Sequence, residues 1–220
     1  MEEVRVRIAP SPSGNLHIGT ARTALFNYLY AKKNNGKYIL RIEDTDAERT
    51  KQEYIDNIFD SLKALGLSWD EGPDVGGEYG PYTQSQRFDI YPKYAQILLE
   101  KGFAYECFCT PEELEAEKEE ATKNKTAYVY SKKCEHLTEE QKEALRKEGR
   151  KPAIRFSVDK AQKAFHDSSM LHFEDLVKGD LHQDTSLIGD FVIMKSNGTP
   201  TYNFAVVIDD MLMKISHIIR

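Results

Sequence analysis

The chain has 220 residues, of which 40% are hydrophobic and 10% aromatic, and its formal net charge is −6. This composition is sufficient for a buried core in one large domain, or in one domain that carries an inserted lobe, so we expect a globular protein. The negative charge argues against a protein that binds nucleic acid mainly by neutralising phosphates. An RNA partner would have to be held by a local patch, by shape or by segments outside this chain.

Neither the start of the chain nor its apolar runs predict contact with a membrane. The first residues, MEEVRVRI, are charged and lack the apolar stretch of a signal peptide. The longest apolar run, residues 204–208, is too short to cross a bilayer. We therefore expect a cytoplasmic protein in which the three cysteines are reduced.

Strand and helix patterns alternate at the beginning of the chain. Residues 4–9 alternate β-branched and charged side chains, which predicts a strand. A loop over 10–16 follows, and residues 17–33 then have apolar side chains at helical spacing. A second strand is predicted over 37–42.

A second helix is predicted after this strand. Thr50 and Glu53 have the spacing of a capping box, and Gly66 is placed to end the helix. Strand, helix, strand and helix at these lengths predict an α/β fold with a parallel sheet of doubly wound, Rossmann type.

The middle of the chain has a different character, beginning with a Gly/Pro-rich connection over 70–80. Three helices are predicted there, over 84–101, 111–123 and 138–147. Two strands of a small lobe without helical crossovers are predicted over 153–158 and 173–177. The charge run 112–125 is typical of a solvated helix face with ion pairs four residues apart.

From residue 190 the pattern returns to strand, turn, helix and strand. The simplest architecture is an incomplete βα domain interrupted by an α+β insertion. We expect the first part of the βα domain at 1–86, the inserted lobe at 87–196 and the start of the second part at 197–220. The chain is expected to stop within a sheet strand at 218–220.

The loop between the first strand and the first helix carries the richest chemical signal. Such a loop places free backbone N–H groups at a helix N-terminus, where phosphates are favoured. Gly14 and Gly19 would let a nucleotide approach the backbone, and His17 is placed to donate to a phosphate as charge builds up on it. By itself, this pattern favours an ordinary capped loop.

The string PSPSGNLHIGT, residues 10–20, closely resembles the HIGH motif of class I aminoacyl-tRNA synthetases. His17, Ile18, Gly19 and Thr20 occupy its four positions, and threonine in the last place is common in the glutamyl members. Further strings resemble segments of bacterial-type glutamyl-tRNA synthetases in the same order: RIAPS at 7–11, RIEDTD at 41–46, GPYTQSQR at 80–87 and PTYNFA at 200–205. The resemblance covers essentially the whole chain.

This resemblance implies a Rossmann-type catalytic domain with an inserted lobe that binds the acceptor end of tRNA. The implied reaction joins glutamate to ATP, which is accompanied by Mg²⁺, and then transfers glutamate from the adenylate to tRNA. We expect the parent enzyme to be monomeric. The catalytic residues implied are His17, Gly19 and Thr20, and the ATP-binding residues are Pro10, Ser11, Gly14, His17, Ile18, Gly19 and Thr20.

Glutamate has one cationic and two anionic groups, so its site needs a carboxylate and at least one guanidinium. The resemblance places Glu43 at the α-amino group, and Arg7 is the best candidate for a bidentate contact with the side-chain carboxylate. The expected glutamate site comprises Arg7, Ala9, Ser11, Glu43, Tyr202 and Arg220. As alternatives, Arg7 is a surface residue of an edge strand, Glu43 and Asp44 cap the next helix, and Tyr202 belongs to the core.

The cysteines form a second group of candidate ligands. Cys107 and Cys109 lie two positions apart, and Cys134 and His136 repeat that spacing. Four such ligands suit a closed structural Zn²⁺ site, although three thiols can also be buried by chance. Some family members carry zinc in this lobe, and related proteins use a tyrosine where Tyr130 stands. The fourth ligand is expected to be His136 or Tyr130, with His136 preferred.

Three functions remain open at this point. The first is a glutamate–tRNA ligase, of which this chain is the N-terminal fragment. The second is the shorter paralogue that glutamylates queuosine in tRNA, although the strings at 41–46 and 80–84 are more similar to the synthetase. The third is a non-catalytic binder of tRNA or glutamate. The mobile KMSKS-type loop of class I enzymes is not found, so we expect the 220-residue chain itself to be inactive.

Overall fold

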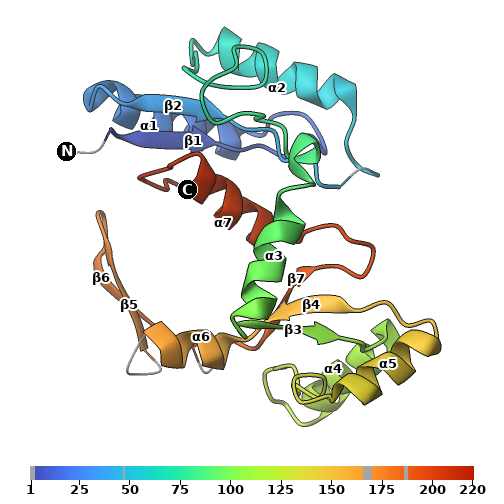
Figure 1. Ribbon diagram of the computed structural model, residues 1–220. Coiled ribbons are helices and arrows are strands. Elements are labelled where there is room, and N and C mark those ends of the chain that lie inside the picture. The colour runs from blue at the N-terminus through green and yellow to red at the C-terminus, as the bar shows by residue number, and fades with distance from the viewer. Residues whose placement is uncertain (1–2, 47, 166–169, 186–187) are drawn as a thin grey trace. The chain divides into compact units, whose positions relative to one another are not determined.

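The structure is a computed structural model that describes residues 3–46, 48–165, 170–185 and 188–220 (Figure 1). The chain divides into two compact units, Met1–Tyr91 with Tyr202–Arg220 and, between them, Pro92–Thr201. Within the described ranges, none of the helices combines the length and the apolar character that a membrane span requires.

The first unit contains the parallel sheet that the sequence predicts. Strands β1 (Arg5–Ile8) and β2 (Lys37–Leu40) pair in parallel and are joined by helix α1 (Ile18–Lys33). Helices α2 (Gln52–Ala64) and α7 (Tyr202–Leu212) complete the unit. Isolated parallel bridges, Ile39 with Glu71 and Ile42 with Thr83, extend the pairing beyond β2.

The two faces of this sheet differ in chemistry because successive side chains of a strand point to opposite sides. Val6 and Leu40 belong to an apolar cluster that also contains buried residues of α1 and α2, among them Ala24, Ile58 and Leu62. The opposite face carries the arginines of β1, which contact α7 and the residues after it. One face therefore carries the larger apolar core, and the other positions charged groups beside a smaller apolar cluster of Ile39, Tyr82 and Met213.

Helix α2 ends as predicted but begins differently. Gly66 has φ +73°, a left-handed conformation that glycine adopts without strain, and the helix ends just before it at Ala64. The predicted capping box is wrong. Lys51 is the N-cap residue without a side-chain bond, because the hydroxyl of Thr50 donates instead to the carbonyl of Asp46 at 2.8 Å.

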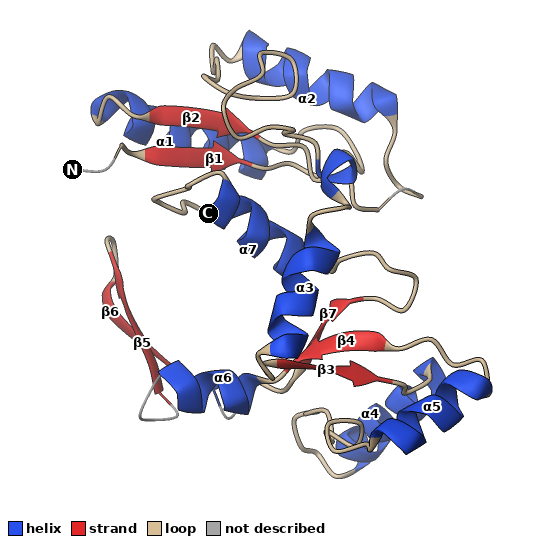
Figure 2. Cartoon of the chain, viewed as in Figure 1, coloured by secondary structure: helices blue, strands red, loops and turns tan. Residues whose placement is uncertain are grey.

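The second unit is built on antiparallel pairing (Figure 2). Strands β3 (Ala104–Cys107), β4 (Ala153–Phe156) and β7 (Phe191–Met194) form one sheet in the order β3-β4-β7. Strands β5 (Met170–Asp175) and β6 (Gly179–Asp184) form a separate hairpin. Its helices are α3 (Tyr91–Glu100), α4 (Pro111–Lys123), α5 (Glu139–Lys147) and α6 (Val158–Phe165).

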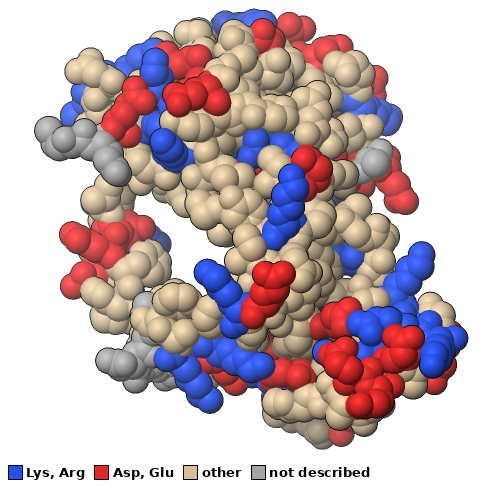
Figure 3. Space-filling view, in the orientation of Figure 1, with Lys and Arg blue, Asp and Glu red and all other residues tan. Residues whose placement is uncertain are grey.

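The predicted helices α4 and α5 are confirmed, and both begin with a capping box, at Thr110 and Thr138. No residue of either helix is buried, and their surface mixes charges of both signs (Figure 3). The Lys123–Glu119 pair at 3.9 Å is one of the ion pairs expected from the charge run. The run 112–125 therefore forms a solvated helix face.

Several predicted elements have different bounds. The helix expected over 84–101 is a short 3₁₀ helix, Gln84–Arg87, followed by α3 from Tyr91. Residues 176–178 form the turn of the β5–β6 hairpin rather than the end of a strand. The strands β3 and β6 and the helix α6 were not predicted; each is short, with 4, 6 and 8 residues.

The strand expected at the end of the chain is also wrong. Residues 215–220 have no regular structure, and only the first of them run beside β1. The backbone N–H groups of Ser216 and His217 both donate to the carbonyl of Arg5, at 2.9 and 3.3 Å. A ladder needs alternating bonds along both chains, so this single point of attachment does not form a strand.

Candidate functional site

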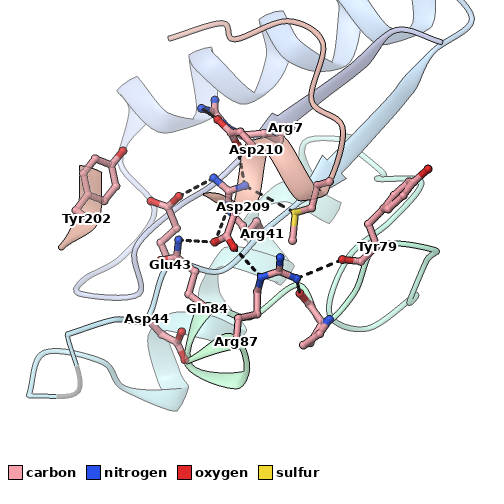
Figure 4. A network of polar contacts seen from close by, with 12 residues as sticks. Arg7, Arg41, Glu43, Asp44, Tyr79, Gln84, Arg87, Tyr202, Asp209 and Asp210 are labelled. Carbon is pink, nitrogen blue, oxygen red and sulfur yellow. Dashed lines mark hydrogen bonds and ion pairs between the residues drawn. The ribbon is translucent and has the colours of Figure 1, made fainter. Parts of the chain in front are cut away.

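Charged side chains from three segments meet on the sheet face that α7 covers (Figure 4). Arg7 comes from β1, Arg41 and Glu43 lie in the extended segment after β2, and Asp209 and Asp210 lie on α7. Arg41 and Glu43 are two positions apart in extended backbone, so their side chains point to the same face. All five residues are less than 9% exposed.

Asp210 links the two arginines. Arg7 donates from Nε and Nη2 to the two carboxylate oxygens of Asp210, at 3.1 and 2.9 Å. Arg41 donates from Nη1 to Asp210 Oδ1 at 2.7 Å and from Nη2 to Glu43 Oε1 at 3.0 Å. A continuous path of charge-assisted hydrogen bonds therefore runs from Arg7 to Glu43.

Asp209 holds a second branch of the network. Gln84 Nε2 and Arg87 Nε donate to its two oxygens, at 2.8 and 2.7 Å, and the hydroxyl of Tyr91 donates to it at 3.0 Å. Burial and the neighbouring Asp209 carboxylate raise the pKa of Tyr91, so the phenol remains a donor. This branch ties the segment around the 3₁₀ helix to α7.

Glu43 is a buried carboxylate whose pKa is raised. Burial is the main cause, because it penalises the charged form, and the guanidinium groups of Arg41 and Arg7 act in the opposite direction. A cationic partner would therefore favour the ionised form of Glu43.

A cavity of about 220 Å³ opens beside Glu43. It brings together seven of the residues predicted for the glutamate and ATP sites, together with Ile8, Thr23 and Ile219. Those seven are Arg7, Ala9, Gly19, Thr20, Glu43, Tyr202 and Arg220. Carboxylate and guanidinium groups thus line one small space, as a ligand with charges of both signs requires.

The other predicted ATP residues line an adjacent cavity at the N-terminus of α1. Its lining includes Pro10, Ser11, Gly14, His17 and Thr20. Ile18 is 78% exposed, and it lines neither this cavity nor the two others that contain the predicted site residues. Ser11 also lines a third cavity, which it shares with Glu43 and Tyr202.

His17 is the N-cap residue of α1. Its Nδ1 accepts a hydrogen bond from the backbone N–H of Gly19 at 3.0 Å. A neutral imidazole that accepts at Nδ1 carries its proton on Nε2, so Nε2 is the free donor. A Cβ on Gly14 would meet nothing within 4 Å, so this structure does not show the crowding that was expected to require glycine there.

Three alternative interpretations of single residues do not hold. Arg7 is 4% exposed and paired with Asp210, so it is not a surface residue of an edge strand. Glu43 caps no helix, since Lys51 is the N-cap of α2. Tyr202 is 44% exposed and accepts a short hydrogen bond from Arg220, so it is not a core residue.

The three cysteines of the second unit form a compact cluster, with their sulfur atoms within 4.8 Å of one another. The Sγ atoms of Cys109 and Cys134 lie 3.5 Å apart. The hydroxyl of Tyr130 is 3.4 Å from Cys107 Sγ and 3.1 Å from Cys109 Sγ. Hydrogen bonds from Cys134, and also from Tyr130 and Arg155, lower the pKa of Cys107 despite its burial, which favours a thiolate.

His136 does not join this cluster. Its side chain is 83% exposed and lies nearest to the carboxylate of Glu135, at 3.9 Å. The preference for His136 over Tyr130 is therefore reversed. Tyr130 is fixed beside the sulfurs because its ring packs under the guanidinium of Arg155, 3.8 Å from the ring centroid.

Sequence reasoning did not assign roles to Arg41, Asp209, Asp210, Gln84 or Arg87. Asp209 and Asp210 are embedded in an otherwise apolar helix, and two adjacent acids at such a position are a signal of buried ion pairing. Their partners lie more than 100 positions away in the sequence, as the Arg87–Asp209 pair illustrates. Local pattern alone does not identify such partners.

Comparison with known proteins agrees with this arrangement. Residues 3–220 match the family described as the catalytic domain of class I tRNA synthetases (E and Q). The chain is 57% identical to glutamate–tRNA ligase 1 of Caldicellulosiruptor saccharolyticus over 218 residues, which are 99% of this chain and 44% of that protein. It is 55% identical to the glutamate–tRNA ligase of Bacillus licheniformis, with the same coverage.

Solved structures show the same fold. A glutamate tRNA ligase from Elizabethkingia meningosepticum, crystallised with its amino acid, superposes with a TM-score of 0.86 at 40% identity, over 99% of this chain and 43% of that one. The chain thus spans less than half the length of the relatives that it matches. On the evidence of its sequence match, fold and charged cavity, the chain belongs to the class I tRNA synthetase (E and Q) catalytic domain family.

Proposed function

We propose that the chain is the N-terminal part of a glutamate–tRNA ligase, which activates glutamate with ATP and transfers it to the acceptor end of tRNA. The observation that carries this proposal is the cavity that combines Glu43 with Arg7, Arg220 and Tyr202. Glutamate carries one ammonium and two carboxylates, and the cavity supplies one carboxylate and two guanidinium groups for them. The names of the relatives support the same substrate.

Each side chain has a role in this proposal. Glu43 pairs with the α-ammonium group of glutamate, and Arg7 contacts the side-chain carboxylate with the donor atoms that Asp210 leaves free. Tyr202 and Arg220 close the cavity on its other side. Ala9 and Ser11, at the end of β1, complete the amino-acid site.

ATP with Mg²⁺ is proposed to bind beside the N-terminus of α1, along the residues Pro10, Ser11, Gly14, His17, Ile18, Gly19 and Thr20. Free N–H groups at a helix start favour phosphate. His17 Nε2 donates to the α-phosphate as negative charge develops during adenylate formation, and Gly19 orients the imidazole through its bond to Nδ1.

The cysteine cluster is proposed to hold a structural Zn²⁺ with Tyr130 as its fourth ligand. With Zn–S bonds of about 2.3 Å and a Zn–O bond of about 2.0 Å, tetrahedral edges are roughly 3.8 Å between sulfurs and roughly 3.5 Å between sulfur and oxygen. The Cys109–Cys134 distance of 3.5 Å and the Tyr130–Cys107 distance of 3.4 Å are close to these values. The donor set therefore fits the ion.

The remaining parts of the architecture are inferred from the family. We infer that the parallel sheet is the first half of a doubly wound Rossmann-type sheet, and that the lobe within 87–196 contacts the acceptor end of tRNA. A complete enzyme of this kind is expected to act in the cytoplasm as a monomer. The queuosine-modifying paralogue is less well supported, because the relatives reported above are named glutamate–tRNA ligases.

ATP–pyrophosphate exchange by the whole protein tests the proposal. With tRNA present, L-glutamate should support exchange, while L-glutamine and L-aspartate should not, because they lack the side-chain carboxylate or shorten its reach to Arg7. Exchange that is equally fast with glutamine would contradict the assigned charge pattern. Absence of exchange with every amino acid would contradict the proposed activity itself.

A further inference from the structure

Arg41 stands apart from the other charged residues of the site. Its side chain is fully buried, and it is absent from the lining of the cavity that Arg7 and Glu43 share. Nevertheless, its planar guanidinium donates to Glu43 with one terminal nitrogen and to Asp210 with the other, while Nε lies 3.9 Å from Asp209. Asp210 in turn binds Arg7 through both oxygens. A single buried residue thus connects the two oppositely charged groups of the cavity.

We propose that Arg41 is a positioning residue that fixes the distance and the ionisation of the two groups that recognise the charged ends of the amino-acid substrate. This inference rests on the proposed function, since it assumes that Glu43 and Arg7 bind the ammonium and the carboxylate of one ligand. Arg41 itself does not contact the ligand.

The donors and acceptors that remain free agree with this role. Arg41 uses only Oε1 of Glu43, and Arg7 uses Nε and Nη2 for Asp210. Among the residues that the structure describes, Glu43 Oε2 and Arg7 Nη1 have no hydrogen-bond partner. Each cavity residue is therefore held by one side of its polar group and presents the other side to a ligand. A rigid fork suits this task because it presents donors in a fixed plane.

The positive charge of Arg41 also favours the ionised form of Glu43. The charged and titratable groups around Glu43 are Arg41 from its own segment, Arg7 from β1, Asp210 and Tyr202 from α7, Arg220 near the end of the chain, and Asp46 and Arg49 from the loop before α2. Burial and Asp210 oppose ionisation of Glu43, and the two guanidinium groups favour it. Without Arg41, the Glu43 carboxyl would stay protonated to higher pH. A protonated carboxyl does not pair with an ammonium group.

Arg87 offers a matched control. It is also buried, at 2% exposure, and it also donates to an aspartate of α7 at 2.7 Å. Its carboxylate partner is Asp209, and it also donates to the carbonyls of Tyr79 and Pro81. No hydrogen bond or ion pair joins it to Glu43 or Arg7 within the described part of the chain. A purely structural role, such as attachment of α7 to the rest of the unit, would be disturbed equally by the loss of either arginine.

The test compares Arg41→Met, Arg41→Lys and Arg87→Met in the whole protein, with glutamate-dependent exchange followed from about pH 6 to about pH 9. Arg41→Met should raise KM for glutamate roughly 10²-fold at neutral pH and change kcat less than about threefold, because uniform binding is lost. Its KM should fall again as the pH rises and Glu43 ionises. Arg41→Lys keeps the positive charge but lacks the planar set of donors that reaches both carboxylates. It should raise KM roughly tenfold, and KM should depend on pH as in the wild type.

Arg87→Met should lower the melting temperature while leaving the pH dependence of KM unchanged. The inference is overturned if both Arg41 variants keep the KM of the wild type, or if Arg41→Met and Arg87→Met show the same pH-independent loss. If Arg41→Met does not fold, the test rests on Arg41→Lys, in which KM should rise while kcat changes little. Failure of the wild type to exchange would overturn the proposed function and this inference with it.

Discussion

The most informative single substitution in the second unit is Tyr130→Phe. It removes the hydroxyl that lies 3.4 Å from Cys107 Sγ and 3.1 Å from Cys109 Sγ. The ring should stay in place, because it packs 3.8 Å from the guanidinium of Arg155. The change therefore deletes one proposed metal ligand with little loss of packing. His136→Gln is the control, since that side chain is 83% exposed.

The size of the effect follows from the number of ligands. Structural Zn²⁺ sites of four ligands bind with roughly 10 to 16 kcal/mol, so one ligand contributes on the order of 3 kcal/mol, or roughly 10² in affinity. Tyr130→Phe should lose about that factor, and Cys107→Ser should lose the metal during purification. His136→Gln should retain the affinity of the wild type.

Competition with a chromophoric zinc chelator measures these affinities directly, and metal analysis of freshly purified protein gives the stoichiometry, expected to be close to one zinc per chain. The reasoning would be refuted if His136→Gln lost zinc while Tyr130→Phe kept it. Metal-free protein with a normally folded second unit would refute the metal site altogether.

Three further predictions concern the first unit. His17→Ala should slow adenylate formation by roughly 10² to 10³ with little change in glutamate affinity, measured by single-turnover kinetics; an effect confined to glutamate binding would contradict the phosphate role. Lys214 has φ +53°, so Lys214→Gly should raise stability by about 1 kcal/mol in thermal denaturation, whereas Lys214→Ala should not. Burial opposes ionisation of Glu71, but hydrogen bonds from Arg5 and Tyr82 lower the pKa of its carboxyl group below 4.5. The ionised Glu71 therefore stabilises the fold fully above pH 4.5, and this stabilisation is lost as the pH falls through the lowered pKa. Unfolding titrations should therefore show less acid destabilisation for Glu71→Gln than for the wild type.

Much of the first unit was predictable because its signals are local. The alternation over 4–9 and the helical spacing over 17–33 are confirmed as β1 and α1, and His17 lies at the helix start where the loop pattern placed it. The capping boxes at Thr110 and Thr138 were not among the predictions, whereas the one predicted at Thr50 does not form. At Thr50 the prediction was wrong, because the hydroxyl group donates a hydrogen bond to the carbonyl of Asp46.

Contacts between residues that are far apart in the sequence could not be predicted. The role of Arg41 depends on Asp210, which lies 169 positions later in the sequence. The choice between Tyr130 and His136 depends on how the chain folds back to bring a residue of the 124–138 segment beside Cys107 and Cys109, 21 to 23 positions earlier. Neither contact produces a periodic pattern in the sequence, so both could be identified only from the structure.

Transfer of labelled glutamate to tRNA by the whole protein tests the central proposal most directly. With ATP and Mg²⁺, the label should become attached to tRNA, and ribonuclease digestion should release it as glutamyl-adenosine from the acceptor end. The Glu43→Gln variant should transfer little or none, because it lacks the charge that pairs with the α-ammonium group. Label recovered on an internal modified base, or no transfer at all by a folded protein, would contradict the proposal that this site charges tRNA with glutamate.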